Sequence, residues 1–306
     1  MILRGVVALS IAMGLIGATG CLATTGVSAD DPEQPTIPSS TAHDPTATVT
    51  ATSVPPATPT PTIPPTPTAT PRPLMEGPFT IGISVLGRPL EAYRIGKGPI
   101  SRVIIGGIHG GYEWNTTVLV NRLVDYFWAS PELVPPEVTL YLIPCANPDG
   151  AAAGTDRIHG RMNANGVDLN RNWDYEWQSV ASHGPWPVSG GTAPFSEPET
   201  AALRDFILSR GIQAAIFYHS ALSMVFAGAG RETSKTEELA LLMARYTGYQ
   251  YMPNGLPGQI TTGDAIDWLT SIGITAVEIE LTTHEDLDWT RNLQAMLAFL
   301  QWDLPE

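Results

Sequence analysis

Cysteine is nearly absent from this 306-residue chain, which contains only two. A disulfide framework and a zinc site built on thiolates are therefore excluded, because each needs several cysteines. Any bound metal must be held by histidine and carboxylate side chains. Basic residues are also scarce: 16 lysines and arginines face 30 aspartates and glutamates, which leaves a net charge of −14. Such a chain repels a phosphate backbone, so nucleic acid is not an expected partner.

The first 20 residues have the architecture of a secretory signal peptide. Arg4 precedes an apolar run from Gly5 to Gly17, which is short for a membrane span. The stretch from Ala18 to Cys21 resembles a bacterial lipobox, whose cysteine is acylated and becomes the mature N-terminus. We therefore expect a protein that is secreted or lipid-anchored to the outer face of a bacterial membrane. Ordinary cleavage nearby, or an uncleaved anchor, is the alternative.

Aromatic residues are missing from residues 31–75, where 13 of the 28 prolines and 12 threonines are found. Such a segment buries too little apolar surface to fold, and it populates extended polyproline II conformations. Residues 21–75 are therefore predicted to be a disordered linker, either a stalk above a membrane or a spacer. Hydrophobic residues make up 43% of the whole chain, which is enough for a sizeable core in the remaining 76–306.

Strand-like and helix-like segments alternate within 76–306. Buried, β-branched runs predict strands, and apolar residues at helical spacing predict helices. The expected strands are 80–84, 91–95, 102–108, 138–143, 212–218 and 275–281, and the expected helices are 115–128, 198–208, 234–246, 264–271 and 288–299. A capping box is predicted at 196–199. The alternation indicates one α/β domain with a mixed, mostly parallel sheet and helices on both faces.

Three polar side chains interrupt these apolar strands near their carboxyl ends. His109 follows one strand, His219 ends another, and Glu280 lies within the strand 275–281. Each has an ordinary structural explanation alone, but together at one sheet edge they are more simply explained as a site. Two imidazoles and one carboxylate suit catalytic zinc, so His109, the nearby Glu113 and the distant His219 are candidate ligands. Glu280 would then carry the proton.

These residues lie in motifs that resemble those of the zinc carboxypeptidases over essentially all of residues 80–300. Six pieces occur in that family's order: GIHG at 107–110, NPDG at 147–150, GVDLNRN at 166–172, FSEPE at 195–199, His219-Ser220 and Glu280-Leu281. Only GVDLNRN is distinctive by itself, but six in order make coincidence implausible. The resemblance implies one zinc ion per chain, held by His109, Glu113 and His219, with Glu280 as general base and acid.

The resemblance also implies contacts to a substrate. Asn170 and Arg171 match the pair that grips a terminal carboxylate, a role suited to an amide beside a bidentate guanidinium. Arg161 matches the arginine that polarises the scissile carbonyl and stabilises the oxyanion. Arg157 is the second candidate for this role. Ile266 falls where the family lines its side-chain pocket, which hints at an uncharged terminal residue.

Two features depart from the family pattern. The family separates its first two ligands by two residues, whereas three lie between His109 and Glu113. Positions i and i+4 share a helix face as well as i and i+3 do, so zinc binding is still expected. The family's substrate-closing tyrosine has no counterpart, because Gln259 stands in its place. Tyr249 and Tyr251 are the candidates to substitute for it, but we expect that neither does.

The sequence leaves three functions open. The first is a monomeric, zinc-dependent exopeptidase that removes C-terminal residues from peptides with a free C-terminus. The second is a related zinc amidohydrolase that acts on muropeptides or N-acyl amino acids. The third is a catalytically inactive peptide-binding module, which the altered ligand spacing favours and the retained Glu280 and Asn-Arg pair oppose. The predicted export of the protein argues against a cytosolic metabolite as substrate. Of the three functions, we expect the exopeptidase.

Overall fold

The computed structural model describes residues 74–306 apart from 231–232, 254 and 305–306. The expected signal peptide, the lipobox cysteine Cys21 and the linker as far as residue 73 lie outside the described residues. None of the helices in the described part has the length and apolar character that a membrane crossing requires.

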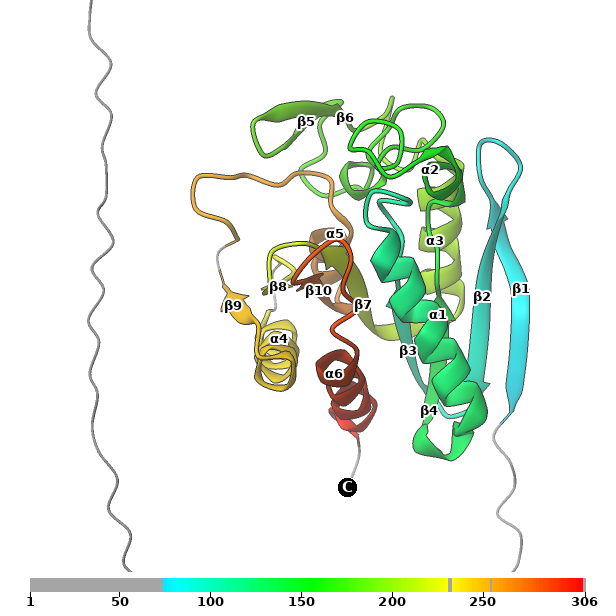
Figure 1. The fold of residues 1–306 in the computed structure, drawn as a ribbon. Coiled ribbons are helices and arrows are strands. Elements are labelled where there is room, and N and C mark those ends of the chain that lie inside the picture. The colour runs from blue at the N-terminus through cyan, green and yellow to red at the C-terminus, as the bar shows by residue number, and fades with distance from the viewer. Residues whose placement is uncertain (1–73, 231–232, 254, 305–306) are drawn as a thin grey trace, which may run out of the picture. The chain divides into compact units, whose positions relative to one another are not determined.

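Eight strands form one mixed sheet, in the order β1–β2–β4–β3–β7–β10–β8–β9 (Figure 1). Their bounds are β1 Met75–Ile83, β2 Pro89–Gly96, β3 Ile100–Ile105, β4 Val138–Ile143, β7 Ile212–Ser220, β8 Met224–Ala227, β9 Gln250–Met252 and β10 Thr275–Leu281. The central strands β4, β3, β7 and β10 run parallel to one another, and β8 and β9 are also parallel. The remaining pairings are antiparallel. The mixed, mostly parallel sheet predicted from the sequence is confirmed.

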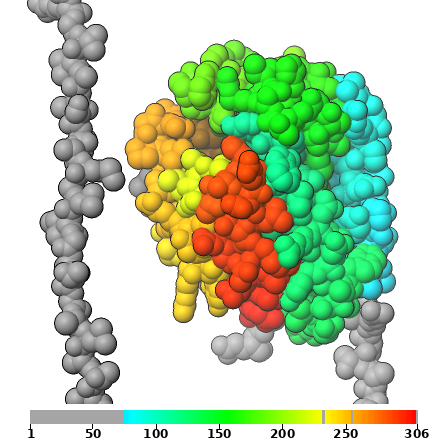
Figure 2. Space-filling model, viewed as in Figure 1, coloured from blue at the N-terminus to red at the C-terminus, as the bar shows by residue number. Residues whose placement is uncertain are grey.

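Helices cover both faces of this sheet. Their bounds are α1 Trp114–Ala129, α2 Pro148–Ala153, α3 Pro198–Ser209, α4 Ser234–Thr247, α5 Ala265–Ser271 and α6 Trp289–Gln301, with short 3-10 turns η1 at Pro131–Leu133 and η2 at Leu169–Arg171. One core lies under α1, α4 and α6, and a second lies under α3 and α5. In the space-filling view the red α6 fills the space between the yellow α4 and the green α1 (Figure 2). A separate hairpin, β5 Val180–His183 with β6 Trp186–Ser189, stands above the sheet.

The two cores leave the central strands buried on both sides. On β3, Val103 and Ile105 pack into the core under α3 and α5, while Ile104 packs into the other. Each such side chain contributes about 1.5–3 kcal/mol by leaving water. Because both faces are filled, polar side chains of these strands meet solvent only near the strand ends, where sites in open α/β sheets collect.

The predicted capping box at the start of α3 does not form. Glu197 is the N-cap residue and makes no side-chain capping bond, while the Ser196 hydroxyl donates to its carboxylate. Glu199 is fully buried and accepts hydrogen bonds from the Asn163 side chain and the Val85 backbone N–H. These two carboxylates therefore hold neighbouring loops and do not cap the helix. Glu199 is buried and accepts from N–H groups distant in sequence, so it does not reach back to the backbone at the start of α3.

Candidate active site

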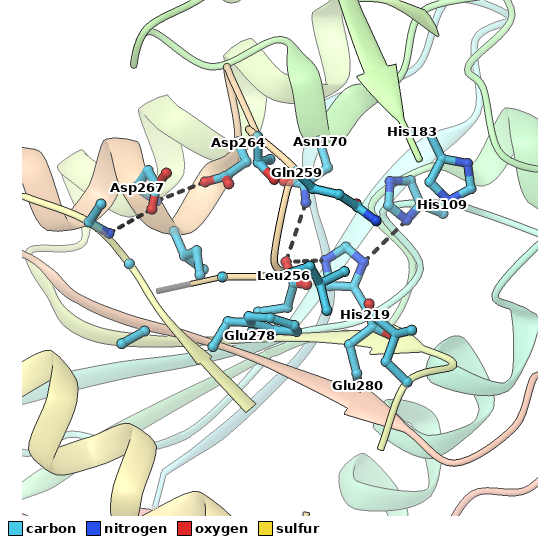
Figure 3. A pocket seen from close by; sticks show the side chains of 18 of the residues that line it. His109, Asn170, His183, His219, Leu256, Gln259, Asp264, Asp267, Glu278 and Glu280 are labelled. Carbon is cyan, nitrogen blue, oxygen red and sulfur yellow. Dashed lines mark hydrogen bonds and ion pairs between the residues drawn. The ribbon is translucent and has the colours of Figure 1, made fainter. Parts of the chain in front are cut away.

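The carboxyl ends of β3, β7 and β10 bring the expected residues together. β7 and β10 pair in parallel with His219 opposite Glu280. β3 flanks β7 on its other side and leads into the turn that carries His109. Figure 3 shows these three side chains around one cavity. The order of the strands in the sheet therefore places His109, His219 and Glu280 together, as their positions at the strand ends predict.

Residues 109–113 form a turn directly before α1. The Glu113 backbone N–H lies 3.5 Å from the His109 carbonyl oxygen, and the two side chains meet on one side of the turn. Gly110 has a φ of +45°, which favours glycine, and a Cβ at Gly111 would lie 2.0 Å from the Gly154 carbonyl oxygen. The glycine pair thus accommodates the additional residue between the two candidate ligands.

Three side chains direct their donor atoms at one point. His109 Nδ1 lies 2.8 Å from Glu113 Oε1, and His219 Nδ1 lies 3.2 Å from His109 Nδ1 and 3.1 Å from Glu113 Oε2. Zinc bonds of about 2.0–2.1 Å at tetrahedral angles separate ligand atoms by roughly 3.3 Å, so a small expansion admits the ion. All three residues are 2% exposed, and among the described residues Glu113 Oε2 makes only the ion-pair contact with His219, without a hydrogen bond. The group fits zinc in donor chemistry and in size.

A carboxylate also lies beside the other nitrogen of each imidazole. His109 Nε2 is 3.1 Å from Asp168 Oδ1, and His219 Nε2 is 3.3 Å from Glu278 Oε2. The hydrogen bond at His109 is of the kind that fixes the tautomer and orientation of an imidazole that binds a metal through its remaining nitrogen, whereas the Glu278 contact at His219 is an ion pair without a hydrogen bond. Burial opposes a charge on His219, but Glu278 and Glu113 outweigh it and raise its pKa to about 9. The surroundings of His219 therefore favour positive charge.

Glu280 lies beside this group, and within the described residues its Oε2 has no hydrogen-bond partner. Its side chain lines the cavity, and the residue is 8% exposed. Burial, reinforced by Glu278 and Glu113, raises its pKa well above the ordinary value. Such surroundings favour the protonated form of the carboxyl group, which suits a residue that accepts and returns a proton.

Arg161 is held at the metal ligands by two carboxylates. Its Nε donates to Asp168 at 2.9 Å and its Nη1 to Glu113 at 3.3 Å, and it is 3% exposed. Arg157, the reserve candidate, stacks on the Trp186 ring at 4.2 Å and does not line the cavity. Of the two arginines considered in the sequence, only Arg161 therefore lines the cavity.

Asn170 and Arg171 lie on η2 with their side chains at the cavity. Asn170 accepts from the Ala265 backbone N–H at 3.0 Å, which ties it to α5. Arg171 donates to the backbone carbonyls of Ser182 and Asn170. In the described part of the chain no carboxylate forms an ion pair with Arg171, so its charge is available to an anionic ligand.

The cavity has a volume of about 820 Å³ and includes the side-chain pocket expected at Ile266, which is 4% exposed. Gln259 lines it from the segment between β9 and α5, and Tyr251 lines it from β9. Tyr249 does not, because its hydroxyl is hydrogen-bonded to Asp288 at 2.6 Å. Of the two tyrosines considered as substitutes, only Tyr251 therefore lines the cavity.

Sequence analysis assigns no role to Asp168 or Glu278, although each contacts a candidate ligand. Asp168 stands two residues before Asn170 within GVDLNRN, so the motif contains a signal for it. Glu278 stands two residues before Glu280, and alternate residues of a strand share a face. The two-residue repeat of a strand therefore predicts that Glu278 lies on the same face of β10 as Glu280, and so in the same cavity.

Comparisons with known proteins point to one family. A family model described as zinc carboxypeptidase matches residues 70–290. Carboxypeptidase B of Astacus astacus is 33% identical over 161 residues, which cover 46% of this chain and 52% of that protein. Murein peptide amidase A of Escherichia coli (strain K12) is 29% identical over 235 residues, which cover 72% of this chain and 88% of that protein.

Solved structures share the fold. Murein-tripeptide amidase from Escherichia coli O157 superposes with a TM-score of 0.54 at 23% identity, covering 78% of this chain and 96% of that one. Thrombin activatable fibrinolysis inhibitor gives a TM-score of 0.59 at 20% identity, covering 75% and 67%. The matched region spans about half the length of the Astacus astacus enzyme. Because the family model extends over most of the chain, the chain belongs to the zinc carboxypeptidase family, a family of zinc-dependent hydrolases, and its candidate metal ligands lie together.

Proposed function

We propose that this protein is a metallocarboxypeptidase that removes C-terminal residues from peptides. The observation that carries the proposal is the position of Arg171, whose guanidinium lines the cavity of the metal triad and Glu280 without a carboxylate partner in the described residues. Such a guanidinium favours a planar anion that can accept two parallel hydrogen bonds. A free C-terminal carboxylate is the anion that a peptide offers.

Each residue then has a distinct task. Bound zinc would supply Lewis acidity and lower the pKa of a coordinated water toward about 7. Glu280 would take a proton from the attacking water and return it to the leaving nitrogen. Arg161 would donate to the scissile carbonyl oxygen as negative charge develops there. Asn170 and Arg171 would hold the terminal carboxylate and so position the last peptide bond.

A zinc amidohydrolase that acts on muropeptides or N-acyl amino acids is the second candidate. It is favoured by the similarity to murein peptide amidase A, which extends over 72% of this chain. Both reactions break an amide bond, so they would use the same triad and the same Glu280. The inactive binding module is opposed by the buried, unpartnered Glu280 carboxylate, which binding alone does not require.

Matched peptides with free and amidated C-termini test the proposal. We expect the zinc-loaded protein to release the last residue of the free acids and to act at least about 100-fold more slowly on the amides, because Arg171 then has no charge to pair. Arg171→Ala should remove most of this preference, whereas Arg157→Ala should keep it. Products are identified by mass spectrometry. Equal cleavage of the amides would contradict exopeptidase action, and cleavage of a muropeptide alone would favour the amidohydrolase.

The proposed place of action is outside the cytoplasm, with the chain as a monomer and Cys21 as a lipid anchor. The support is the sequence alone, from Arg4 through the apolar run to the lipobox-like stretch. Metabolic labelling with a fatty acid should mark the full chain and leave Cys21→Ala unlabelled. Equal labelling of that variant would contradict a lipid anchor at this cysteine.

A further inference from the structure

His284 lies on the loop after β10 and lines the cavity. The residue is half-buried, and its ring packs against the ring of Tyr112, with 4.7 Å between the two ring centroids. Tyr112 directly precedes the candidate metal ligand Glu113. The cavity therefore holds, close to the metal triad, an imidazole that the proposed reaction does not use.

A series of hydrogen bonds leads from the loop backbone to this imidazole. The side-chain nitrogen of Asn115 donates to the backbone carbonyls of Thr283 and Asp286, at 2.7 and 2.9 Å. These two carbonyls fix the orientation of the amide, so the Asn115 Oδ1 atom can only accept. The Ser220 hydroxyl donates to this oxygen at 3.0 Å. The single proton of the hydroxyl is therefore directed to Asn115.

The same hydroxyl determines which nitrogen of His284 carries the proton. His284 Nδ1 lies 3.0 Å from Ser220 Oγ, whose own proton is directed elsewhere, so Nδ1 must be the donor. The reverse arrangement would leave the Asn115 oxygen, which is fully buried, without a donor. The neutral imidazole then has its lone pair on Nε2. Within the described residues, this Nε2 makes no hydrogen bond.

The order of residues along β10 places His284 beyond the reacting bond. Asn170, which would hold the terminal carboxylate in the proposed function, donates to Glu278 at 3.4 Å. Glu280 stands two residues further along the same face of β10, and His284 follows the end of that strand. A peptide with its carboxylate at Asn170 and its scissile bond at Glu280 therefore extends its preceding residue toward His284.

We propose that His284 is a substrate-binding residue, whose Nε2 accepts a hydrogen bond from the backbone N–H of the peptide residue just before the scissile bond. The inference rests on the proposed function, because it assumes that the cavity binds a peptide. Ser220 and Asn115 are positioning residues, since they hold the imidazole in the tautomer that presents this acceptor. An acceptor that is fixed before binding loses little side-chain freedom when the peptide binds.

Matched peptides that differ only in this N–H test the inference. In one peptide the residue before the scissile bond is alanine, and in the other it is lactic acid. Lactic acid replaces the N–H by an ester oxygen and leaves the scissile amide unchanged. We expect kcat/KM to favour the alanine peptide by about 5–50-fold, because the ester oxygen removes the hydrogen bond and faces the Nε2 lone pair. Equal kcat/KM values in the wild type would overturn the inference.

His284→Phe provides the matched variant, because it keeps a ring against Tyr112 and removes both nitrogens. The preference for the alanine peptide should largely disappear, mainly through slower cleavage of that peptide. His159→Ala alters an exposed histidine outside the cavity and should keep the wild-type preference. An unchanged preference in folded His284→Phe would count against the assignment, because the N–H would then have another acceptor.

NMR of protein that carries isotope-labelled histidines tests the tautomer without turnover. Under mildly alkaline conditions that keep imidazoles neutral, the His284 signal should show a protonated Nδ1 and an unprotonated Nε2. The signal is identified by its absence from His284→Phe. A protonated Nε2 would overturn the inference even in an active enzyme.

Calorimetric binding of the same two peptides separates this inference from the proposed function. If the wild-type protein cleaves no peptide with a free C-terminus, the exopeptidase proposal fails, and binding still decides the role of His284. Tighter binding of the alanine peptide supports the inference, and equal dissociation constants overturn it.

Discussion

Glu280→Gln is expected to lower kcat by about 10²–10⁴-fold, the usual contribution of a positioned general acid and base. The amide has almost the shape of the protonated carboxyl group but cannot take a proton from water. Since Glu280 is buried with a raised pKa, the neutral amide should fit its surroundings without loss of folding. The measurement is steady-state hydrolysis together with zinc content, which should match the wild-type value.

Two further variants test whether the loss of activity is specific to Glu280. Glu285→Gln removes a carboxylate from an exposed position on the loop after β10 and should retain full activity. Glu278→Gln tests the other strand carboxylate, which lies 3.3 Å from His219 and should affect metal affinity more than the proton transfer. Full activity in Glu280→Gln combined with an inactive Glu278→Gln would transfer the acid–base role to Glu278.

The fold was predictable where burial dominates local sequence. The strands at 138–143 and 275–281 have the bounds of β4 and β10, because short, largely apolar runs that contain β-branched residues match strands covered on both faces. The short strands β5, β6, β8 and β9 were not predicted. They have three or four residues of mixed character, and tertiary pairing decides their conformation more than propensity does.

The residues of the site also divide into those that the sequence predicts and those that it does not. His109, His219 and Glu280 were recognisable because burying a polar side chain at an apolar strand costs free energy unless the side chain has a partner. Asp264 and Asp267 gave no such signal, since aspartates at the start of a helix are ordinary capping residues. Only the packing of α5 places both of them on the lining of the cavity. Local sequence therefore identified the candidate metal ligands but not the chemistry of the pocket beside them.

The proposed hydrolysis depends on one zinc ion held by His109, Glu113 and His219, of which His219 is the most distant in sequence. Replacing a hydrogen-bond partner of a metal ligand costs about 10–100-fold in affinity, and loss of a ligand itself should cost more. We therefore expect His219→Ala to lose zinc during dialysis that leaves the wild type loaded. His159→Ala, which alters an exposed histidine, is the matched control.

The decisive measurement is elemental analysis of the dialysed proteins, with circular dichroism to confirm that the variants fold. One zinc ion per chain in the wild type and in His159→Ala, with little or none in folded His219→Ala, is the predicted result. A wild-type protein that takes up no zinc on titration, or a His219→Ala variant that retains one ion as firmly as the wild type, would contradict the assignment of the metal centre.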